Sequence, residues 1–205
     1  AGNWESWMYG RSLENYNNAF TWAKWVTPSR DLIRDFHNEG DTARFNQTVV
    51  YYACTWSNYY PAANYPFMYK LRSGYNNEYV VRLADIILLE AEAYAFKGNI
   101  QKSADLVNMI RQRAKLPNLT ADKTSSKDAM IMAVLHERRL ELALEGERWF
   151  DLCRYGKVEE FMNSINSRDE GRLPQKKVFD KNSYLFPIPQ TALDQNPNLV
   201  QNPGY

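Results

Sequence analysis

Four charged residues between positions 138 and 148 have the types and the spacing of an ion-pair ladder. Arg138, Glu141, Glu145 and Arg148 carry the signs plus, minus, minus and plus at intervals of three, four and three residues. On a helix these intervals bring neighbours onto one face, so Arg138 can reach Glu141 and Arg148 can reach Glu145. Catalytic sites and structural ion networks both contain such clusters, and we interpret this one as structural.

The apolar residues around these charges indicate how deeply the charges lie. If one helix runs through Gly146, then Leu142 and Trp149 share a side with the charges. Leu140 lies on the opposite side, and a helix that is apolar on two sides is sandwiched between neighbours. Charges this near a core need partners, because a stranded buried charge costs roughly 3–5 kcal/mol. We therefore expect Glu145 and Trp149 in the interior.

The sequence contains no complete catalytic motif. His136 and Glu137 begin like the helix of a zinc protease, but the second histidine of that motif would stand at position 140, which is leucine. Cys54 and Cys153 are too few and too far apart for a zinc site or a disulfide framework. The sequence therefore predicts no metal site, no cofactor and no catalytic residue. A glycosidase-type pair of carboxylates stays open as an alternative, because its separation depends on the fold.

Composition and charge exclude two further classes. The chain has 25 basic and 24 acidic residues, which leave a net charge of +1. This balance gives no electrostatic footprint for nucleic acid. No apolar run reaches the length of a membrane-spanning helix. With 205 residues the chain can bury one sizeable core or two small ones.

The aromatic residues give the positive functional signal. They make up 14% of the chain, with six tryptophans and fourteen tyrosines, many in polar, loop-like sequence. Sugars present C–H faces that stack on aromatic rings and hydroxyls that pair with amides. A proline-bracketed loop and the start of the chain supply the candidates for a glycan site, which are Trp56, Asn58, Tyr59, Tyr60, Trp4 and Trp7. The alternative for each ring is a place over the core, because large aromatic residues are mostly buried.

Residues 1–79 are predicted to form an irregular, aromatic-rich region with one short helix. That helix is expected over Ser29–His37, with Gly40 as its end. The β-prone segments Phe45–Ala53 and Phe67–Arg72 predict two short strands, which can form a small hairpin.

Residues 80–205 are predicted to be helical at first and then coiled. A helix over Leu83–Lys97 closes at Gly98, and a second one, with an apolar stripe from Ile100 to Ala114, is capped by Asn99. Two helices joined by about two residues form an antiparallel hairpin, here similar to a tetratricopeptide unit.

The last forty residues, 166–205, are polar and rich in asparagine and proline. They predict an extended coil with one turn of helix at Thr191–Asp194. Such a tail stays ordered only if its apolar residues dock onto the helices. Those residues are Phe179, Tyr184, Leu185, Phe186 and Ile188.

Four stretches in this order resemble the RagB/SusD family. The most specific is Glu137–Leu152, with the sequence ERRLELALEGERWFDL. The others are Val81–Ala93 (VRLADIILLEAEA), Val107–Ala114 (VNMIRQRA) and the terminus from Phe186, FPIP, to Tyr205. Each is weak alone, but four in order are specific, and the similar region covers roughly residues 27–205.

The resemblance implies a mainly α-helical fold. It implies several tetratricopeptide-like helical hairpins, a small irregular or β-hairpin region and a long, ordered C-terminal coil. The second helix pair would cover roughly Ser126–Glu145 and Arg148–Ser164. In this reading residues 1–79 begin the family's C-terminal region, and residues 80–205 form its helical part.

The resemblance also implies a function. RagB/SusD proteins are surface glycan-binding lipoproteins of Gram-negative nutrient-uptake systems. The chain would then be the C-terminal portion of a longer outer-membrane protein, attached to the membrane only through a lipid anchor upstream of residue 1. It would not be an enzyme. It would capture oligo- or polysaccharide and partner a SusC-like TonB-dependent outer-membrane barrel. A helical module that binds protein or peptide, and a fragment of an α/α glycoside hydrolase, are the alternatives.

Overall fold

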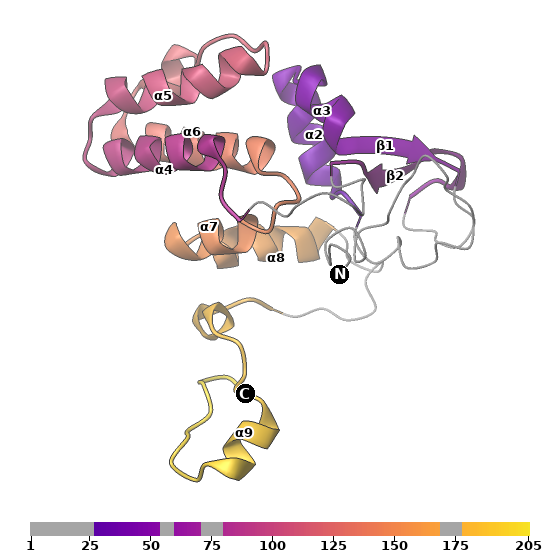
Figure 1. The fold of residues 1–205 in the computed structure, drawn as a ribbon, viewed down its shortest axis with the longest axis vertical. Helices are drawn as coiled ribbons and strands as arrows, with labels where there is room; N and C mark the ends of the chain where they lie inside the picture. Colours follow the sequence, from indigo (N-terminus) through magenta and orange to yellow (C-terminus); the bar gives the residue numbers. More distant parts are fainter. Residues whose placement is uncertain (1–26, 54–59, 71–79, 169–177) are drawn as a thin grey trace. The chain divides into compact units, whose positions relative to one another are not determined.

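A computed structural model describes residues 27–53, 60–70, 80–168 and 178–205 of the chain (Figure 1). The chain divides into two compact units, residues 1–147 and 148–205. The division at residue 79, which is based on composition, stays a prediction.

The first unit is helical apart from one small sheet. Its elements in chain order are α2 (Arg30–Glu39), α3 (Thr42–Thr48), β1 (Val49–Tyr52), the 3₁₀ helix η3 (Ala62–Asn64), β2 (Tyr65–Met68), α4 (Leu83–Phe96), α5 (Ile100–Arg113), the 3₁₀ helix η4 (Ala121–Thr124) and α6 (Lys127–Glu141). The predicted class, mainly α-helical with a small β-hairpin, is confirmed.

The second unit consists of short helices and coil. Its elements are α7 (Arg148–Arg154), α8 (Val158–Arg168), the 3₁₀ helix η5 (Lys181–Tyr184) and α9 (Gln190–Gln195). The helical turn predicted at Thr191–Asp194 lies inside α9. In the described parts of both units, no helix has the length and apolar character needed to span a membrane.

Helix α2 begins one residue later than expected, with Ser29 as its N-cap, and ends at the expected glycine, Gly40. The Ser29 hydroxyl accepts a hydrogen bond from the Leu32 amide at 3.1 Å, which satisfies one of the free donors of the first turn. Gly40 ends the helix with φ +67°, a left-handed conformation that glycine adopts without strain.

The strand predicted from Phe45 is wrong over its first half. The side chain of Asp41 accepts a hydrogen bond from the Arg44 amide at 3.1 Å and so caps a helix, α3, which continues to Thr48. Only from Val49 do β-branched and aromatic residues follow in succession, and β1 begins there. The cap at Asp41 therefore prevails over the β propensity of the residues that follow it.

The predicted hairpin exists, with its second strand two residues earlier than expected. β1 and β2 pair antiparallel, with Val49 opposite Met68 and Tyr52 opposite Tyr65. Tyr65, Phe67 and Met68 are buried, so β2 is apolar on both sides.

The predicted helical hairpin is formed by α4 and α5, which lie side by side (Figure 1). Gly98 turns the chain with φ +78°, and the Asn99 side chain accepts a hydrogen bond from the Lys102 amide at 3.3 Å. The Ser103 hydroxyl donates to the Ala91 carbonyl at 2.7 Å and ties the two helices together.

Helix α6 packs on this hairpin and completes the larger core. Leu88, Ala91, Val107, Met130 and Val134 are all 0% exposed and come from three helices, α4, α5 and α6. Each of these helices faces the other two, which agrees with the apolar stripes in the sequence.

One continuous helix through Gly146 is wrong. α6 ends at Glu141, and the chain turns through Leu144 with φ +67° and Gly146 with φ +92° before α7 begins at Arg148. Backbone in the left-handed region cannot continue the hydrogen-bond ladder of a right-handed helix. The predicted second pair is therefore a shorter α6, followed by two short helices, α7 and α8.

The tail of the second unit contacts α7 and α8 mainly through Phe179 and Tyr184, whereas Leu185 and Phe186, also expected to dock, are 55% and 74% exposed. The ring of Trp149 has its centroid 6.2 Å from that of Phe179 and 6.5 Å from that of Phe186. The side chain of Asn163 bonds both to the carbonyl of Phe179, at 2.8 Å, and to its amide, at 2.9 Å. The Tyr184 hydroxyl donates to Glu159 at 2.7 Å.

Trp149 is half-buried and not, as expected, in the core. It does not share a helix face with Leu142, because α6 ends at Glu141 and Trp149 lies on α7.

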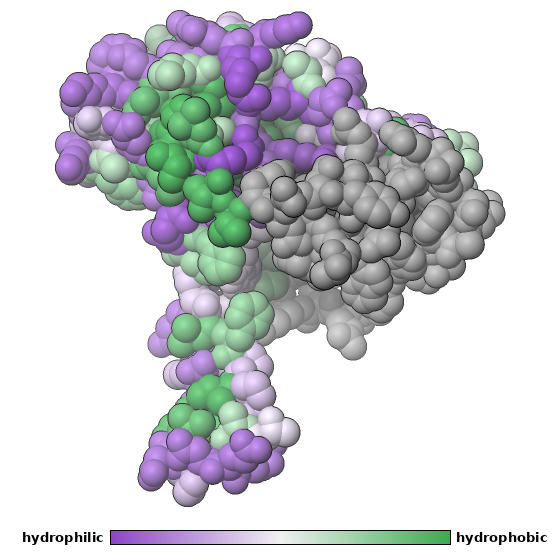
Figure 2. All heavy atoms as spheres, viewed as in Figure 1, coloured by the Kyte–Doolittle hydropathy of each residue, from purple (hydrophilic) through white to green (hydrophobic). Residues whose placement is uncertain are grey.

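Apolar residues also gather on the surface over α4 and the segment that leads into it (Figure 2). The exposed members are Val80, Val81, Leu83, Ile86 and Phe96.

The core and surface of α4 give a matched pair of substitutions. Leu88→Ala, at a site that is 0% exposed, should lower the free energy of unfolding by about 2–5 kcal/mol because it leaves a cavity. Leu83→Ala, at a site that is 73% exposed, should change it little. Urea denaturation followed by circular dichroism measures both. Equal midpoints for the two variants would contradict this arrangement of the core.

Candidate functional site

Most of the residues that the sequence suggests for a glycan site are not described by the structure. Those outside the described residues are Trp4, Trp7, Trp56, Asn58 and Tyr59.

Tyr60 is described, and its side chain is held by the first unit. Its hydroxyl donates to the carbonyl of Pro28 at 2.7 Å. The guanidinium carbon of Arg30 lies 5.2 Å from its ring centroid, and the ring meets that of Tyr65 edge-on at 5.5 Å. Tyr60 is therefore anchored at the start of α2.

Three carboxylates at intervals of four residues form the polar centre of the first unit. Glu137 and Glu141 lie on α6 and are 0% and 2% exposed, and Glu145 follows in the turn after α6. Each of the three is paired with more than one cation. The cations come from other elements, and we call this set of residues the α6 ion network.

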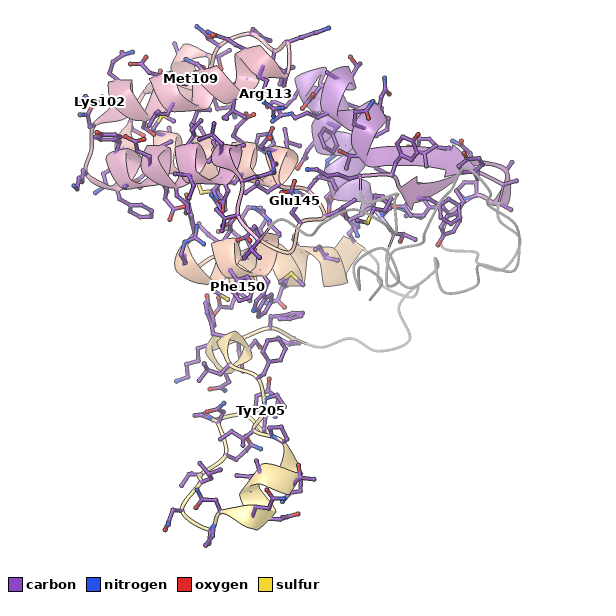
Figure 3. The ribbon with its side chains drawn as sticks, in the orientation of Figure 1. Lys102, Met109, Arg113, Glu145, Phe150 and Tyr205 are labelled. Carbon is purple, nitrogen blue, oxygen red and sulfur yellow. The ribbon has the colours of Figure 1, made fainter. Side chains whose placement is uncertain are left out.

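Glu141 joins three arginines from three parts of the chain. Its Oε1 accepts from Arg82 at 2.6 Å and from Arg113 at 2.5 Å, and its Oε2 accepts from Arg44 at 3.1 Å. Arg44 lies on α3, Arg82 precedes α4, and Arg113 ends α5 (Figure 3). One buried carboxylate thus connects three elements to α6.

Glu145 binds Arg82 through both of its oxygens. Oε2 accepts from Nε of Arg82 at 2.6 Å and Oε1 accepts from its terminal nitrogen at 2.8 Å, the two-pronged geometry that makes arginine–carboxylate pairs strong. Lys70 also pairs with Glu145, and its ammonium donates to the backbone carbonyl of Glu141 at 2.7 Å.

Glu137 lies between the arginines on its two sides. Its Oε1 accepts from Arg44 at 2.7 Å and its Oε2 accepts from Arg111 at 3.0 Å. Arg44 also pairs through Nε with Asp41, the residue that caps α3. The cap of α3 and the network on α6 therefore share one guanidinium.

The predicted ladder residues have partners that the spacing did not suggest. Arg138 donates to the Asp85 carboxylate on α4 at 2.7 Å. In the second unit, the guanidinium of Arg148 lies 5.0 Å from the ring centroid of Phe161. The sequence did contain a signal for one such partner, because Arg82 and Asp85 interrupt an otherwise apolar run.

The network keeps its groups charged despite burial. Burial works against the ionised form of Glu141, but the hydrogen bonds and charges of the arginines outweigh it and lower the pKa of this carboxyl. Burial likewise opposes the charge of Arg82, and its bonds to Glu145 and Glu141 raise its pKa above the ordinary value. Burial is not offset in the same way at Lys70, whose pKa is lowered.

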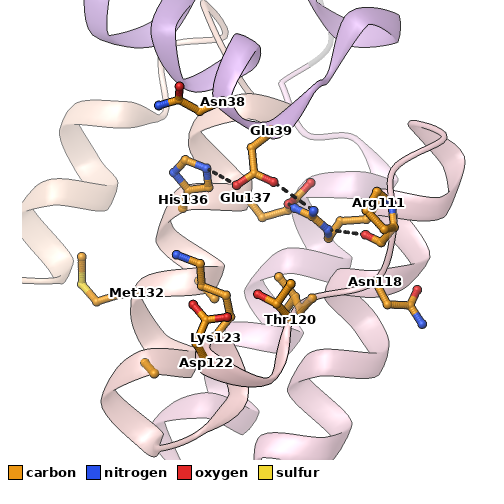
Figure 4. A pocket seen from close by; sticks show the side chains of 14 residues that line it. Asn38, Glu39, Arg111, Asn118, Thr120, Asp122, Lys123, Met132, His136 and Glu137 are labelled. Atoms are coloured by element: carbon orange, nitrogen blue, oxygen red, sulfur yellow. Dashed lines mark hydrogen bonds and ion pairs between the residues drawn. The ribbon is translucent and has the colours of Figure 1, made fainter.

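A pocket of about 570 Å³ lies beside the Glu137 end of the network (Figure 4). We call it the His136 pocket. Nε2 of His136 lies 3.1 Å from Oε1 of Glu39, and Arg111 donates to Oε2 of Glu39 at 2.9 Å. Arg111 also donates to the carbonyl of Pro117 at 2.8 Å. These bonds fix one wall of the pocket, while Met132 and neighbouring apolar side chains contribute to the rest.

Glu39 is the most strongly perturbed acid of this pocket. The pKa of Glu39 falls from 4.5 to about 2. The hydrogen bond to His136 is the largest cause of this lowering, burial works against it, and the hydrogen bond and charge of Arg111 add to it. An ionised Glu39 can only accept in this hydrogen bond, so Nε2 of His136 is the donor.

The arrangement can hold a polar ligand, but two of its carboxyl groups are unsuited to act as general acids. Glu39 and Glu141, with lowered pKa values, are both paired with arginine and would donate no proton near neutral pH. In the segments that the structure describes, no three His, Cys, Asp or Glu side chains are grouped to bind a metal ion.

The hairpin of α4 and α5, with α6 packed on it and braced by buried ion pairs, defines a mainly helical protein with a tetratricopeptide-like hairpin. The model of the SusD family matches residues 64–205, which is more than half of the chain. The chain belongs to the SusD family, and the resemblance seen in the motifs is confirmed.

Individual relatives agree with this assignment. "SusD-like protein P38" of Formosa agariphila is 35% identical over 135 residues, which are 63% of this chain and 25% of that protein. The chain thus spans about a quarter of the length of that relative.

Solved structures of the SusD type share the fold. A SusD superfamily protein from Bacteroides vulgatus aligns with 97% of this chain and 48% of its own, with a TM-score of 0.72 and 23% identity. A SusD-like carbohydrate binding protein from Bacteroides fragilis aligns with 77% of this chain and 41% of its own, with a TM-score of 0.59 and 23% identity.

The α6 ion network predicts that neutralising Glu141 strongly lowers the stability of the protein. Glu141→Gln keeps the shape of the side chain but removes the charge that three arginines share, and it should lower the free energy of unfolding by about 3–5 kcal/mol. Glu90→Gln, on the exposed side of α4, is the matched control and should have little effect. Urea denaturation compares them, and a parent-like midpoint for Glu141→Gln would contradict the network.

Glu39 predicts a pH dependence of stability. Its folded pKa of about 2 lies below the ordinary 4.5, so its contribution is complete above pH 4.5 and is lost as the pH falls toward 2. Glu39→Gln should therefore be less stable than the parent at pH 7, with a difference that shrinks steadily below pH 4.5. Denaturation at a series of pH values measures this, and a constant difference down to pH 3 would refute it.

Proposed function

We propose that this chain is part of a cell-surface protein that captures oligo- or polysaccharide and delivers it to a TonB-dependent outer-membrane barrel of the SusC type. The observation that carries the proposal is the match of residues 64–205 to the SusD family. A similar solved structure is described as that of a SusD-like carbohydrate binding protein. The protein would reach the cell surface through a lipid anchor in a longer chain.

The proposed role is binding without catalysis. A glycosidase needs one carboxylic acid with a raised pKa and a second carboxylate at roughly 5–9 Å. The carboxylates of the α6 ion network are instead tied to arginines, and the pKa of Glu141 is lowered. This supports a binding protein over a glycoside hydrolase.

The proposed sugar platform is the aromatic loop around Trp56, with Asn58, Tyr59 and Tyr60, together with Trp4 and Trp7. The anchoring of Tyr60 to Pro28 supports the idea, because binding groups commonly sit on loops held by a rigid scaffold. The His136 pocket offers a second place, since its volume lies in the range of small-molecule sites, roughly 300–1,000 Å³.

The exposed apolar surface over α4 favours one alternative, a helical module that binds protein or peptide. Leu83 and Ile86 are exposed one helical turn apart there, and contiguous apolar patches often mark protein-binding sites. A preference for peptides over oligosaccharides in the titration below would favour this alternative.

Titration with an oligosaccharide panel, followed by tryptophan fluorescence, tests the proposal. We expect weak binding, on the order of 1 mM, because the chain spans part of its relatives. Trp56→Ala should lose at least tenfold in affinity with unchanged melting, and no product should be released. Loss of binding in His136→Ala instead would move the site to the His136 pocket. No response to any oligosaccharide would contradict glycan binding by this chain.

A further inference from the structure

A second pocket, of about 230 Å³, lies at the Glu141 end of the α6 ion network. We call it the Arg44 pocket. One side is formed by α3, which contributes Arg44, Gln47 and Thr48 at the spacing i, i+3 and i+4 that places them on one helix face. The remaining charged lining residues are Lys70, Arg82, Arg113 and Glu141.

The acceptor oxygens of Glu141 in this pocket are already in use. Glu141 is its one carboxylate among the described residues, and both of its oxygens accept from arginines. Its backbone carbonyl accepts from Lys70 and from Arg82, each at 2.7 Å. A ligand that donates hydrogen bonds would therefore have to compete with arginine and lysine for Glu141.

The donors are not all in use. Arg44 pairs through Nε with Asp41 and through one terminal nitrogen with Glu137 and Glu141. Its other terminal nitrogen is buried and has no hydrogen-bond partner among the described residues, and the side chain as a whole is only 9% exposed. A buried donor without a partner is costly, and such a group calls for an acceptor from outside the folded chain.

The charge of the lining points to the same kind of ligand. Four cations and one carboxylate face the pocket. The carboxylates of Asp41, Glu137 and Glu145 stand behind these cations and offset much of their long-range field. A ligand must therefore be held by direct hydrogen bonds at close range. The planar guanidinium of arginine makes such bonds to an oxyanion with matching geometry.

We propose that the Arg44 pocket binds the acid group of an acidic glycan, either the carboxylate of a uronic acid or a sulfate ester. This inference rests on the proposed function and names its substrate class. The oxyanion accepts from the unpartnered nitrogen of Arg44, with Gln47 and Thr48 donating at its edge. Arg113 lines the pocket and its side chain is 59% exposed (Figure 3), so it can shift from Glu141 to admit the oxyanion and then donate to it.

The sharpest test compares ligands that differ only in this charge. The free acid of a trigalacturonate and its methyl ester have the same length and sugar, and the ester lacks the anion. A sulfated oligosaccharide and its desulfated form make a second pair. Calorimetric titration of the parent chain should give at least tenfold tighter binding for the charged member of one pair, and the pair that responds identifies the anion.

Two exposed positions give variants that should fold. Gln47→Glu places a negative charge in the pocket and should abolish the preference for the charged ligand without weakening the neutral one. Asn46→Asp adds the same charge at the neighbouring residue of α3, which does not line the pocket, and should keep the preference. Arg113→Gln should reduce the preference at least fivefold, whereas Arg34→Gln, 61% exposed on α2, should not.

The outcomes separate this inference from the proposed function. Equal binding of charged and neutral ligands, or a preference that survives in Gln47→Glu and Arg113→Gln, would overturn the inference and leave glycan binding intact. Binding of a neutral glycan alone would have the same meaning. Failure of every oligosaccharide would contradict both.

Discussion

The buried carboxylates of Glu137 and Glu141 are the constraint on which the first unit depends. A carboxylate that is almost fully removed from water is stable only with cations at hydrogen-bond distance, and α6 itself does not supply them. They come from Arg44 on α3, Arg82 before α4, and Arg111 and Arg113 on α5. Apolar packing holds α4, α5 and α6 together, but the hydrophobic effect is not directional. The ion pairs are directional, and they set the position of α3 and of the helix ends around α6.

The same network shapes the His136 pocket and the Arg44 pocket. Arg111 joins Glu137 to Glu39 and forms a wall of the His136 pocket, and Arg44 joins Glu137 to Asp41 and lines the Arg44 pocket. Because its arginine partners lower the pKa of Glu141, this carboxylate is suited to presenting a fixed charge and not to transferring a proton. This character agrees with membership of the SusD family and with a proposed role in capturing glycans.

The local elements were largely predictable, since their signals are local. Ser29 and Gly40 bound α2, and Gly98 and Asn99 bound the turn between α4 and α5, as their side-chain and backbone chemistry suggests. The errors arose where two local signals competed. The cap at Asp41 made helix of residues with strand propensity, and left-handed backbone at Leu144 and Gly146 divided an apparently continuous apolar pattern into α6 and α7.

The sequence by itself determined the family, the helical class, the hairpin of α4 and α5 and the need of the charges near Glu141 for partners. Only the tertiary structure decided which partners those are. Arg44 and Glu141 are 97 positions apart, and Arg82 and Glu145 are 63 apart. Helical spacing proposes neighbours three or four residues away, but a buried carboxylate binds whichever guanidinium the packing of other helices brings to it. The unpartnered nitrogen of Arg44, and with it the proposed anion pocket, follows from that packing and has no local signature in the sequence.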